Sequence, residues 1–97
     1  MSRSEKQFEN EVKGWLKDHG AWFLKTWSNG VQRAGVPDIL VCHKGRFIAL
    51  ELKTKSGRVS ELQKYEIERI RKAGGHAVVL RDETDDFDLF KKFYLQM

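Results

Sequence analysis

The sequence predicts a small α/β fold, a mixed sheet flanked by helices, and three patterns support this class. Apolar residues recur at helical spacing after Ser4, and two short apolar runs, Ile39–Cys42 and Phe47–Leu50, flank a polar connection that contains a glycine. A second helical pattern then precedes a buried strand. The predicted order is helix, strand, hairpin, helix, strand, helix. Because 97 residues provide for one core, we expect a single domain over residues 1–97.

The first predicted helix begins at Ser4, because Gln7 stands three positions on in a capping-box pattern. Gly20 ends this helix, and its apolar face consists of Phe8, Val12, Trp15 and Leu16. Glu9 lies at the margin of that face, so it can lean toward the strand ends. The alternative for Glu9 is a solvated acid near the positive helix N-terminus.

A strand over Ala21–Trp27 and a polar loop over Ser28–Gly35 are expected before the hairpin. Pro37 lacks an N–H donor and suits the start of a strand, so Asp38 opens the first hairpin strand. On the second hairpin strand the side chains alternate between faces. One face holds Ile48, Leu50 and Leu52, and the other holds Phe47, Ala49, Glu51 and Lys53.

The charged residues of this hairpin stand at strand ends, where a scaffold can present charge without burying it. Carboxylate oxygens are ligands that Mg²⁺ and Mn²⁺ prefer, and Asp38 and Glu51 would be enough for such an ion. The ammonium of Lys53 could orient an incoming hydroxide or stabilise charge on phosphate oxygens. This set favours metal-assisted cutting of a phosphodiester.

The second predicted helix begins near Ser60, with Gln63 as its capping-box partner. Its inward side is expected to hold Val59, Leu62, Glu66, Ile67, Ile70 and Ala73. Gln63 lies on the same side, so it bonds back to the helix start, or its amide reaches the metal-bound water or the substrate phosphate, and the two roles are compatible. The preceding loop, Thr54–Arg58, carries two cations, two hydroxyls and a glycine, which suits phosphate contact; a generic polar turn is the alternative.

After the glycine pair that ends the second helix, His76–Leu80 reads as a buried strand and Asp85–Tyr94 as a closing amphipathic helix. The aromatics Phe87, Phe90 and Tyr94 are expected in the core or in a dimer contact. The acidic run Asp82–Asp86 suits a helix cap, because the ligand spacing of an EF-hand is missing.

The charge balance is uneven along the chain. Residues 1–80 hold 15 basic and 9 acidic side chains, and residues 81–97 hold 3 and 5, so the body is +6 and the tail −2. A basic surface beside acidic ligands suits an enzyme that binds the phosphate backbone, although ordinary solubility also accounts for a charge this modest.

Several functional classes are disfavoured by residues that the sequence lacks. The lone Cys42 cannot form an internal disulfide and is expected as a small buried hydrophobe. The three histidines show no zinc-binding spacing, and no P-loop points to a nucleotide cofactor. No secretory or membrane-spanning apolar segment is visible, so we expect a cytoplasmic protein.

Four segments in order, Gly35–Asp38, Glu51–Lys53, Gly57–Ser60 and Gln63, resemble the PD-(D/E)XK nucleases, and the closest branch is the VRR-Nuc domain. The resemblance implies a restriction-endonuclease-like αβββαβ core with a small mixed β-sheet flanked by helices, plus a short C-terminal helix. It also implies a stand-alone, phage-type enzyme similar to Holliday junction resolvases, which would act in the host cytoplasm if phage-encoded.

The resemblance assigns the site residues as follows. A first-helix glutamate completes the metal shell, and Glu9 matches it, with Glu5 as a competitor. The expected cofactor is Mg²⁺ or Mn²⁺, held by Glu9, Asp38, Glu51 and the Leu52 carbonyl. Lys53 and Gln63 complete the expected catalytic set, and the expected DNA contacts are Arg33, Lys55 and Arg58.

The sequence thus predicts a divalent-metal-dependent endonuclease that hydrolyses DNA phosphodiester bonds. Holliday junctions, flaps or other branched DNA are the expected substrates, because a chain this short has little surface for reading base sequence. A homodimer would set two active sites against two strands. The alternative is a catalytically silent DNA-binding or assembly module with the same fold. A restriction-type enzyme with sequence recognition is disfavoured, because the loops are too short.

Overall fold

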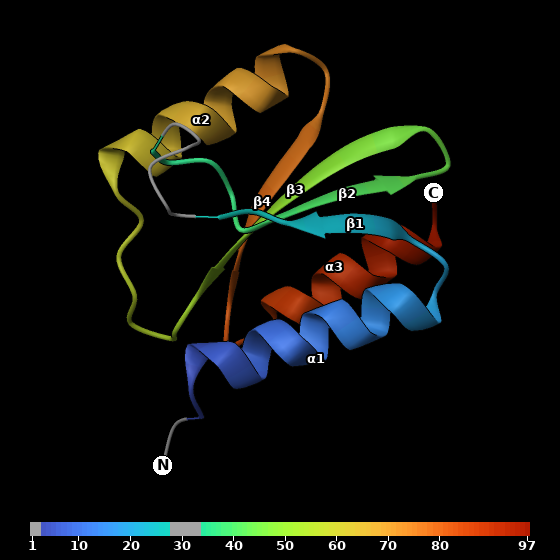
Figure 1. The fold of residues 1–97 in the computed structure, drawn as a ribbon, viewed down its shortest axis with the longest axis horizontal. Helices are drawn as coiled ribbons and strands as arrows, with labels where there is room; N and C mark the ends of the chain where they lie inside the picture. Colours follow the sequence, from blue (N-terminus) through green and yellow to red (C-terminus); the bar gives the residue numbers. More distant parts are fainter. Residues whose placement is uncertain (1–2, 28–33) are drawn as a thin grey trace.

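The computed structural model describes residues 3–27 and 34–97, and their element order confirms the predicted one (Figure 1). The elements are α1 (Glu5–Asp18), β1 (Trp22–Lys25), β2 (Ile39–His43), β3 (Arg46–Lys53), α2 (Glu61–Lys72), β4 (His76–Arg81) and α3 (Asp86–Leu95). None of the described helices is long and apolar enough to cross a bilayer.

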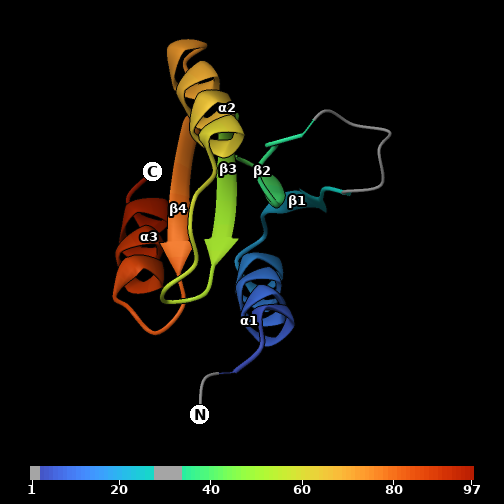
Figure 2. The same ribbon diagram turned by 90° about the vertical axis from the view of Figure 1, so that its left-hand side faces the viewer.

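The four strands form one mixed sheet in the order β1-β2-β3-β4. The β1–β2 and β2–β3 pairs are antiparallel, and β3 and β4 are parallel. Helices α1 and α3 lie on one side of the sheet and α2 lies on the other (Figures 1 and 2). This is the α/β, restriction-endonuclease-like fold that the sequence predicts.

Both predicted helix starts are confirmed by complete capping boxes. At α1, the Gln7 N–H donates to Ser4 Oγ at 3.2 Å and the Ser4 N–H donates back to Gln7 Oε1 at 2.8 Å. At α2, the corresponding distances between Ser60 and Gln63 are 3.1 and 2.8 Å. Each box satisfies two backbone donors that no helical carbonyl can reach.

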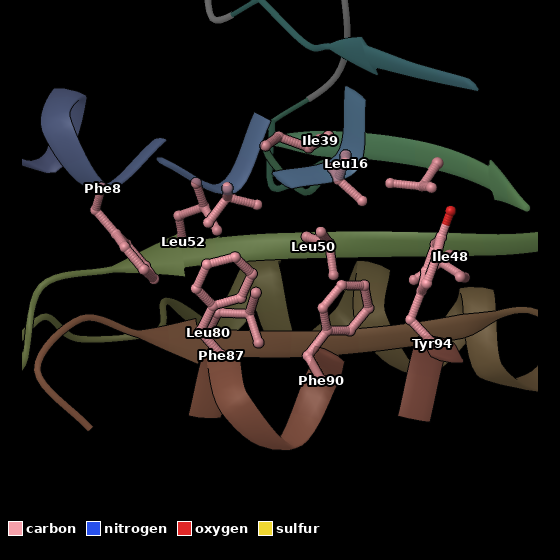
Figure 3. Close-up of a cluster of buried hydrophobic side chains, with 12 residues drawn as sticks. Phe8, Leu16, Ile39, Ile48, Leu50, Leu52, Leu80, Phe87, Phe90 and Tyr94 are labelled. Atoms are coloured by element: carbon pink, nitrogen blue, oxygen red, sulfur yellow. The ribbon is translucent and has the colours of Figure 1, made fainter. Parts of the chain in front are cut away.

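The alternation predicted for β3 is also confirmed. Ile48, Leu50 and Leu52 point into the larger core on the α1 and α3 side (Figure 3). The same core contains Phe87, Phe90 and Tyr94, so these aromatics are core residues. Ala49 points to the opposite side and packs with Ile67 and Ala77 beneath α2. Glu51 and Lys53 continue the Ala49 face because side chains alternate.

Three residues on the α2 side that were expected to be buried or to face inward are exposed. Cys42 is exposed, because it lies opposite Trp22 and Phe47 at an end of the sheet where those two side chains are exposed as well. Leu62 is 56% exposed although it was expected to face inward, and Ala73 at the helix end is exposed too. The buried face of α2 is narrower than predicted, because the buried residues of this helix are Glu66 and Ile67.

The acidic run before α3 caps the helix differently from the expectation. Asp85 is the N-cap residue, but its side chain makes no capping hydrogen bond. Thr84 Oγ1 accepts from the Asp86 N–H at 3.2 Å instead. The carboxylate of Asp82 is buried and accepts two hydrogen bonds from Arg3, each at 2.9 Å. Part of the run therefore anchors the chain before α1 rather than the helix that follows.

Candidate active site

The opposed carboxylates of Asp38 and Glu51 form the centre of the site. Ile39 pairs with Leu50, so continuing this antiparallel register by one residue places Asp38 opposite Glu51. Residues opposite each other share a face of the sheet, with their Cβ atoms about 5 Å apart. Asp38 is fixed in this position because its Oδ2 accepts from the Leu52 N–H at 2.8 Å.

Glu51 is almost completely buried, at 2% exposed, and only one of its oxygens has a hydrogen-bond partner. Oε2 accepts from Gln63 Nε2 at 3.0 Å and lies 3.2 Å from Lys53 Nζ. Oε1 is buried without a hydrogen-bond partner among the residues described. Burial and the neighbouring charge of Asp38 outweigh the attraction of Lys53 and raise the pKa of Glu51 to about 7.

Glu9 lies on α1 and is surrounded by lysines. Its Oε1 lies 3.0 Å from Lys25 Nζ, and its Oε2 lies 3.1 Å from Lys13 Nζ and 3.2 Å from Lys6 Nζ. Burial alone would raise the pKa of Glu9, but the hydrogen bonds from the three lysines outweigh it and lower the pKa to about 2. Glu9 is therefore a firmly ionised carboxylate.

Lys25, at the end of β1, is a site residue that sequence reasoning missed. Its Nζ lies 3.0 Å from Glu9 and 3.6 Å from Asp38 Oδ1, so it joins the helix carboxylate to the strand carboxylate. Burial opposes its charge, but Glu9 and Asp38 outweigh this and raise the pKa of Lys25. The available signal was strand alternation, since Lys25 follows partly buried Phe23 on the side of the sheet that α1 covers.

Gln63 bonds back to the helix start, which is one of its two predicted roles. The other role, contact with metal-bound water or a substrate phosphate, stays a prediction, and in the structure the amide nitrogen contacts a site carboxylate. The amide oxygen caps α2 by accepting from Ser60, while the amide nitrogen donates to Glu51. The helix start and the site carboxylate are thereby held by one side chain.

The remaining predicted residues are placed as follows. Lys55 and Arg58 lie in the loop after β3, adjacent to Lys53. Glu5 is exposed in the first turn of α1, whereas Glu9 is buried, which favours Glu9 over its competitor. Arg33 lies outside the described residues.

The donor set fits a divalent cation of the hard, oxygen-binding kind. Two opposed carboxylates, one with a buried oxygen that lacks a partner, leave negative charge that a cation would neutralise. The N–H and C=O of one strand residue point to the same edge. Because the Leu52 N–H reaches Asp38, the Leu52 carbonyl also faces that side. Glu9 does not share a metal site with Asp38 and Glu51 in this arrangement, because Lys25 lies between Glu9 and Asp38. The described residues accordingly contain no group of three acidic, histidine or cysteine side chains at metal-binding spacing.

Comparison with solved structures supports the fold. A "VRR_NUC domain" structure has 25% sequence identity and a TM-score of 0.78, covering 96% of this chain and 100% of that chain. A "VRR_NUC domain protein" has 20% identity and a TM-score of 0.79, covering 99% and 91%. The Holliday junction resolvase Hjc from Archaeoglobus fulgidus, an archaeal hyperthermophile, has 20% identity and a TM-score of 0.60, covering 81% and 70%. No curated protein sequence matches the chain significantly.

The fold and its likeness to the VRR_NUC structures identify a nuclease of the VRR-Nuc and PD-(D/E)XK type. The profile of the archaeal Holliday junction resolvase (Hjc) family matches residues 1–96, and the chain belongs to that family.

Proposed function

We propose that the protein is a divalent-metal-dependent endonuclease that hydrolyses phosphodiester bonds in junction or otherwise branched DNA. The observation that carries this proposal is the pair of opposed carboxylates, Asp38 and Glu51. Lys53 forms an ion pair with Glu51, and Glu51 Oε1 is buried without a hydrogen-bond partner among the described residues. The membership of a resolvase family supports junction DNA as the substrate class.

Asp38, Glu51 and the Leu52 carbonyl would hold Mg²⁺ or Mn²⁺, with Glu9 as a further ligand if Lys25 moves aside. The bound ion would polarise a phosphate oxygen and lower the pKa of water. The chain's own contribution is positional: the Leu52 N–H fixes Asp38, and the Gln63 amide together with Lys53 fixes Glu51. These contacts give the two carboxylates a defined geometry before substrate arrives.

Lys53 is the residue proposed to act on the reacting phosphate. Its side chain is largely buried beside Glu51, with Nζ 3.2 Å from Oε2. An ammonium in that position can donate to a non-bridging phosphate oxygen, where negative charge grows as the nucleophile attacks. Lys55, Arg58 and Arg33 are proposed to hold the flanking backbone, and a homodimer is proposed to present two such sites to two strands.

A catalytically silent DNA-binding module is the second candidate. It is favoured by the three lysines around Glu9, which neutralise a carboxylate that an active nuclease would direct to a metal ion. The paired Asp38 and Glu51 argue for the enzyme instead. A buried carboxylate oxygen without a hydrogen-bond partner costs stability, and a silent module gains no metal binding in return.

The test is cleavage of labelled four-way junction, flap, duplex and single-stranded DNA in Mg²⁺ or Mn²⁺. Wild type is compared with Asp38→Asn, Lys53→Met and the control Asp88→Asn, an exposed position on α3. Metal-dependent cutting by wild type and the control, lost in the other two variants, supports the enzyme. DNA binding without cutting by wild type supports the silent module. If wild type neither binds nor cuts DNA, both candidate functions are contradicted.

A further inference from the structure

A cavity of about 570 Å³ lies beside the candidate active site, and its lining is strongly basic. Residues 55–59 line it together with Lys64 of α2 and Arg81 of β4. Four of these side chains carry a positive charge, Lys55, Arg58, Lys64 and Arg81, and none is a carboxylate. We call this cavity the basic pocket. Three different elements of the chain contribute its cations, so it is formed by the fold and not by one charged segment.

The basic pocket adjoins the catalytic strand directly. Its lining includes Gly57, where an added Cβ would lie 3.4 Å from Lys53 Cβ and 3.0 Å from Thr54 Oγ1. The Gly57 N–H donates to the Thr54 carbonyl at 3.0 Å, which closes a tight turn straight after Lys53. The lining of the pocket is therefore continuous with the turn that follows Lys53.

Arg81 holds the loop that forms the pocket. Its guanidinium donates to the Gly57 carbonyl, and its backbone N–H donates to Asp86 Oδ2 at 2.9 Å. This contact uses one Nη of a group that has five donors, so the others can serve an anion. Arg81 thus both shapes the loop and adds charge to it.

The other cations of the basic pocket are weakly neutralised. Within the described part of the chain, Lys64 forms an ion pair only with Glu61, at 3.2 Å on the helix surface, and that carboxylate is 88% exposed. An exposed pair of this kind contributes little stability, so an anionic ligand can replace it. Lys55 and Arg58 have no ion-pair partner among the described residues. The pocket therefore holds positive charge that the protein itself leaves largely uncompensated.

We propose that the basic pocket is a second phosphate site, which binds a DNA phosphate that is not the one being cut, and that Lys64 and Arg81 belong to the DNA-binding surface. The inference rests on the proposed function, because it takes its ligand from the strand that reaches Lys53. The shared chemistry is a phosphate group, supplied either by an internal phosphodiester or by a terminal phosphate. Seating a second phosphate would fix the direction of the strand across Asp38 and Glu51.

The test measures the binding of fluorescent four-way junction DNA by anisotropy in EDTA over a series of salt concentrations. Wild type is compared with Lys64→Gln, Arg81→Gln, Arg81→Lys and the control Lys72→Gln, a lysine in the last turn of α2 outside the pocket. Each lost phosphate contact lowers the slope of log K against log salt by about 0.9. Lys64→Gln and Arg81→Gln are expected to show that loss and to bind about three- to tenfold more weakly. Arg81→Lys keeps the unit positive charge and should keep the wild-type salt slope, and Lys72→Gln should match wild type.

A matched arm uses flap DNA with either a 5′-phosphate or a 5′-hydroxyl end. If the variants bind 5′-phosphate DNA more weakly than wild type does but bind 5′-hydroxyl DNA equally well, the ligand is a terminal phosphate. If they bind both DNAs more weakly by the same factor, the ligand is an internal phosphodiester. Unchanged salt slopes in Lys64→Gln and Arg81→Gln, with cleavage by wild type intact, overturn the basic pocket but leave the proposed function standing. If wild type neither cuts nor binds any of the DNAs, the proposed function itself is contradicted. Thermal unfolding of each variant identifies any loss that arises from misfolding.

Discussion

Two carboxylates of the candidate site, Glu51 and Glu9, are both buried but have opposite electrostatic surroundings. Glu51 stands opposite another carboxylate and has one lysine, and its pKa rises to about 7. Glu9 has three lysines within 3.2 Å, and its pKa falls to about 2. Burial is common to both, so the neighbouring charges decide the direction. The Glu51 side retains unbalanced negative charge that a cation would relieve, whereas the Glu9 side is already neutralised.

The largest expected effect comes from removing the opposed carboxylate. Asp38→Asn should lower DNA cleavage by about 10³-fold or more, because it removes a proposed metal ligand whose charge would act in the transition state. It should also lower the pKa of Glu51 toward its ordinary value, since the repelling charge is gone. Carbon-detected NMR titration of the Glu51 carboxyl measures the second effect independently of activity. An unchanged pKa would contradict the pairing of the two groups.

The pH dependence of stability should separate the two carboxylates. Glu51 has a folded pKa of about 7 against 4.5 for the unfolded chain, so its stabilising contribution is complete below pH 4.5 and is lost as pH rises through 7. Glu9 has a folded pKa of about 2, so its contribution is present above pH 4.5 and is lost as pH falls through 2.

The measurement is chemical denaturation of metal-free wild type and Glu51→Gln from pH 4 to 8. The difference in unfolding free energy should change by about 1–3 kcal/mol across pH 4.5–7, with wild type losing stability as pH rises. A difference that stays flat over that interval would show that folding does not raise the pKa of Glu51.

The Glu9 side can be weakened through Lys25. Lys25→Met should reduce unfolding free energy at pH 7 by about 1 kcal/mol, because a buried carboxylate loses one of its partners. Lys6→Met is the matched control, since Lys6 also contacts Glu9 but is 70% exposed, and its loss should cost less than about 0.5 kcal/mol. Equal losses of unfolding free energy in the two variants would show that Lys25 stabilises the site no more than the exposed Lys6 does.

A comparison of two capping-box glutamines isolates the contact between Gln63 and Glu51. Gln7 and Gln63 fill the same capping-box position, but only Gln63 also donates to a site carboxylate. Gln7→Ala should therefore cost about 0.5 kcal/mol through the helix cap alone. Gln63→Ala should cost about 1 kcal/mol more, because the buried Glu51 oxygen loses a donor. Thermal unfolding of both variants measures the difference, and equal costs would assign Gln63 to the cap only.

The elements whose signals are local were predictable from the sequence. The capping boxes at Ser4 and Ser60 need only residues three positions apart, and the alternation along β3 follows from strand geometry. Alternation also predicted that Glu51 and Lys53 share a face. Cys42 and Leu62 were placed wrongly, because the exposure of Cys42 depends on its strand partners and that of Leu62 on which side of α2 faces the sheet. Lys25 was missed for a related reason, since its role depends on α1 bringing Glu9 beside the end of β1.

The central claim is that Asp38 and Glu51 together hold a divalent ion, and calorimetric titration with Mn²⁺ near pH 6 tests it most directly. Wild type and Asp88→Asn should bind the ion and release close to one proton from Glu51, as buffers of different ionisation enthalpy would reveal. Asp38→Asn and Glu51→Gln should bind at least about tenfold more weakly, and Glu51→Gln should release no proton. Binding by these two variants that equals wild type would contradict the claim.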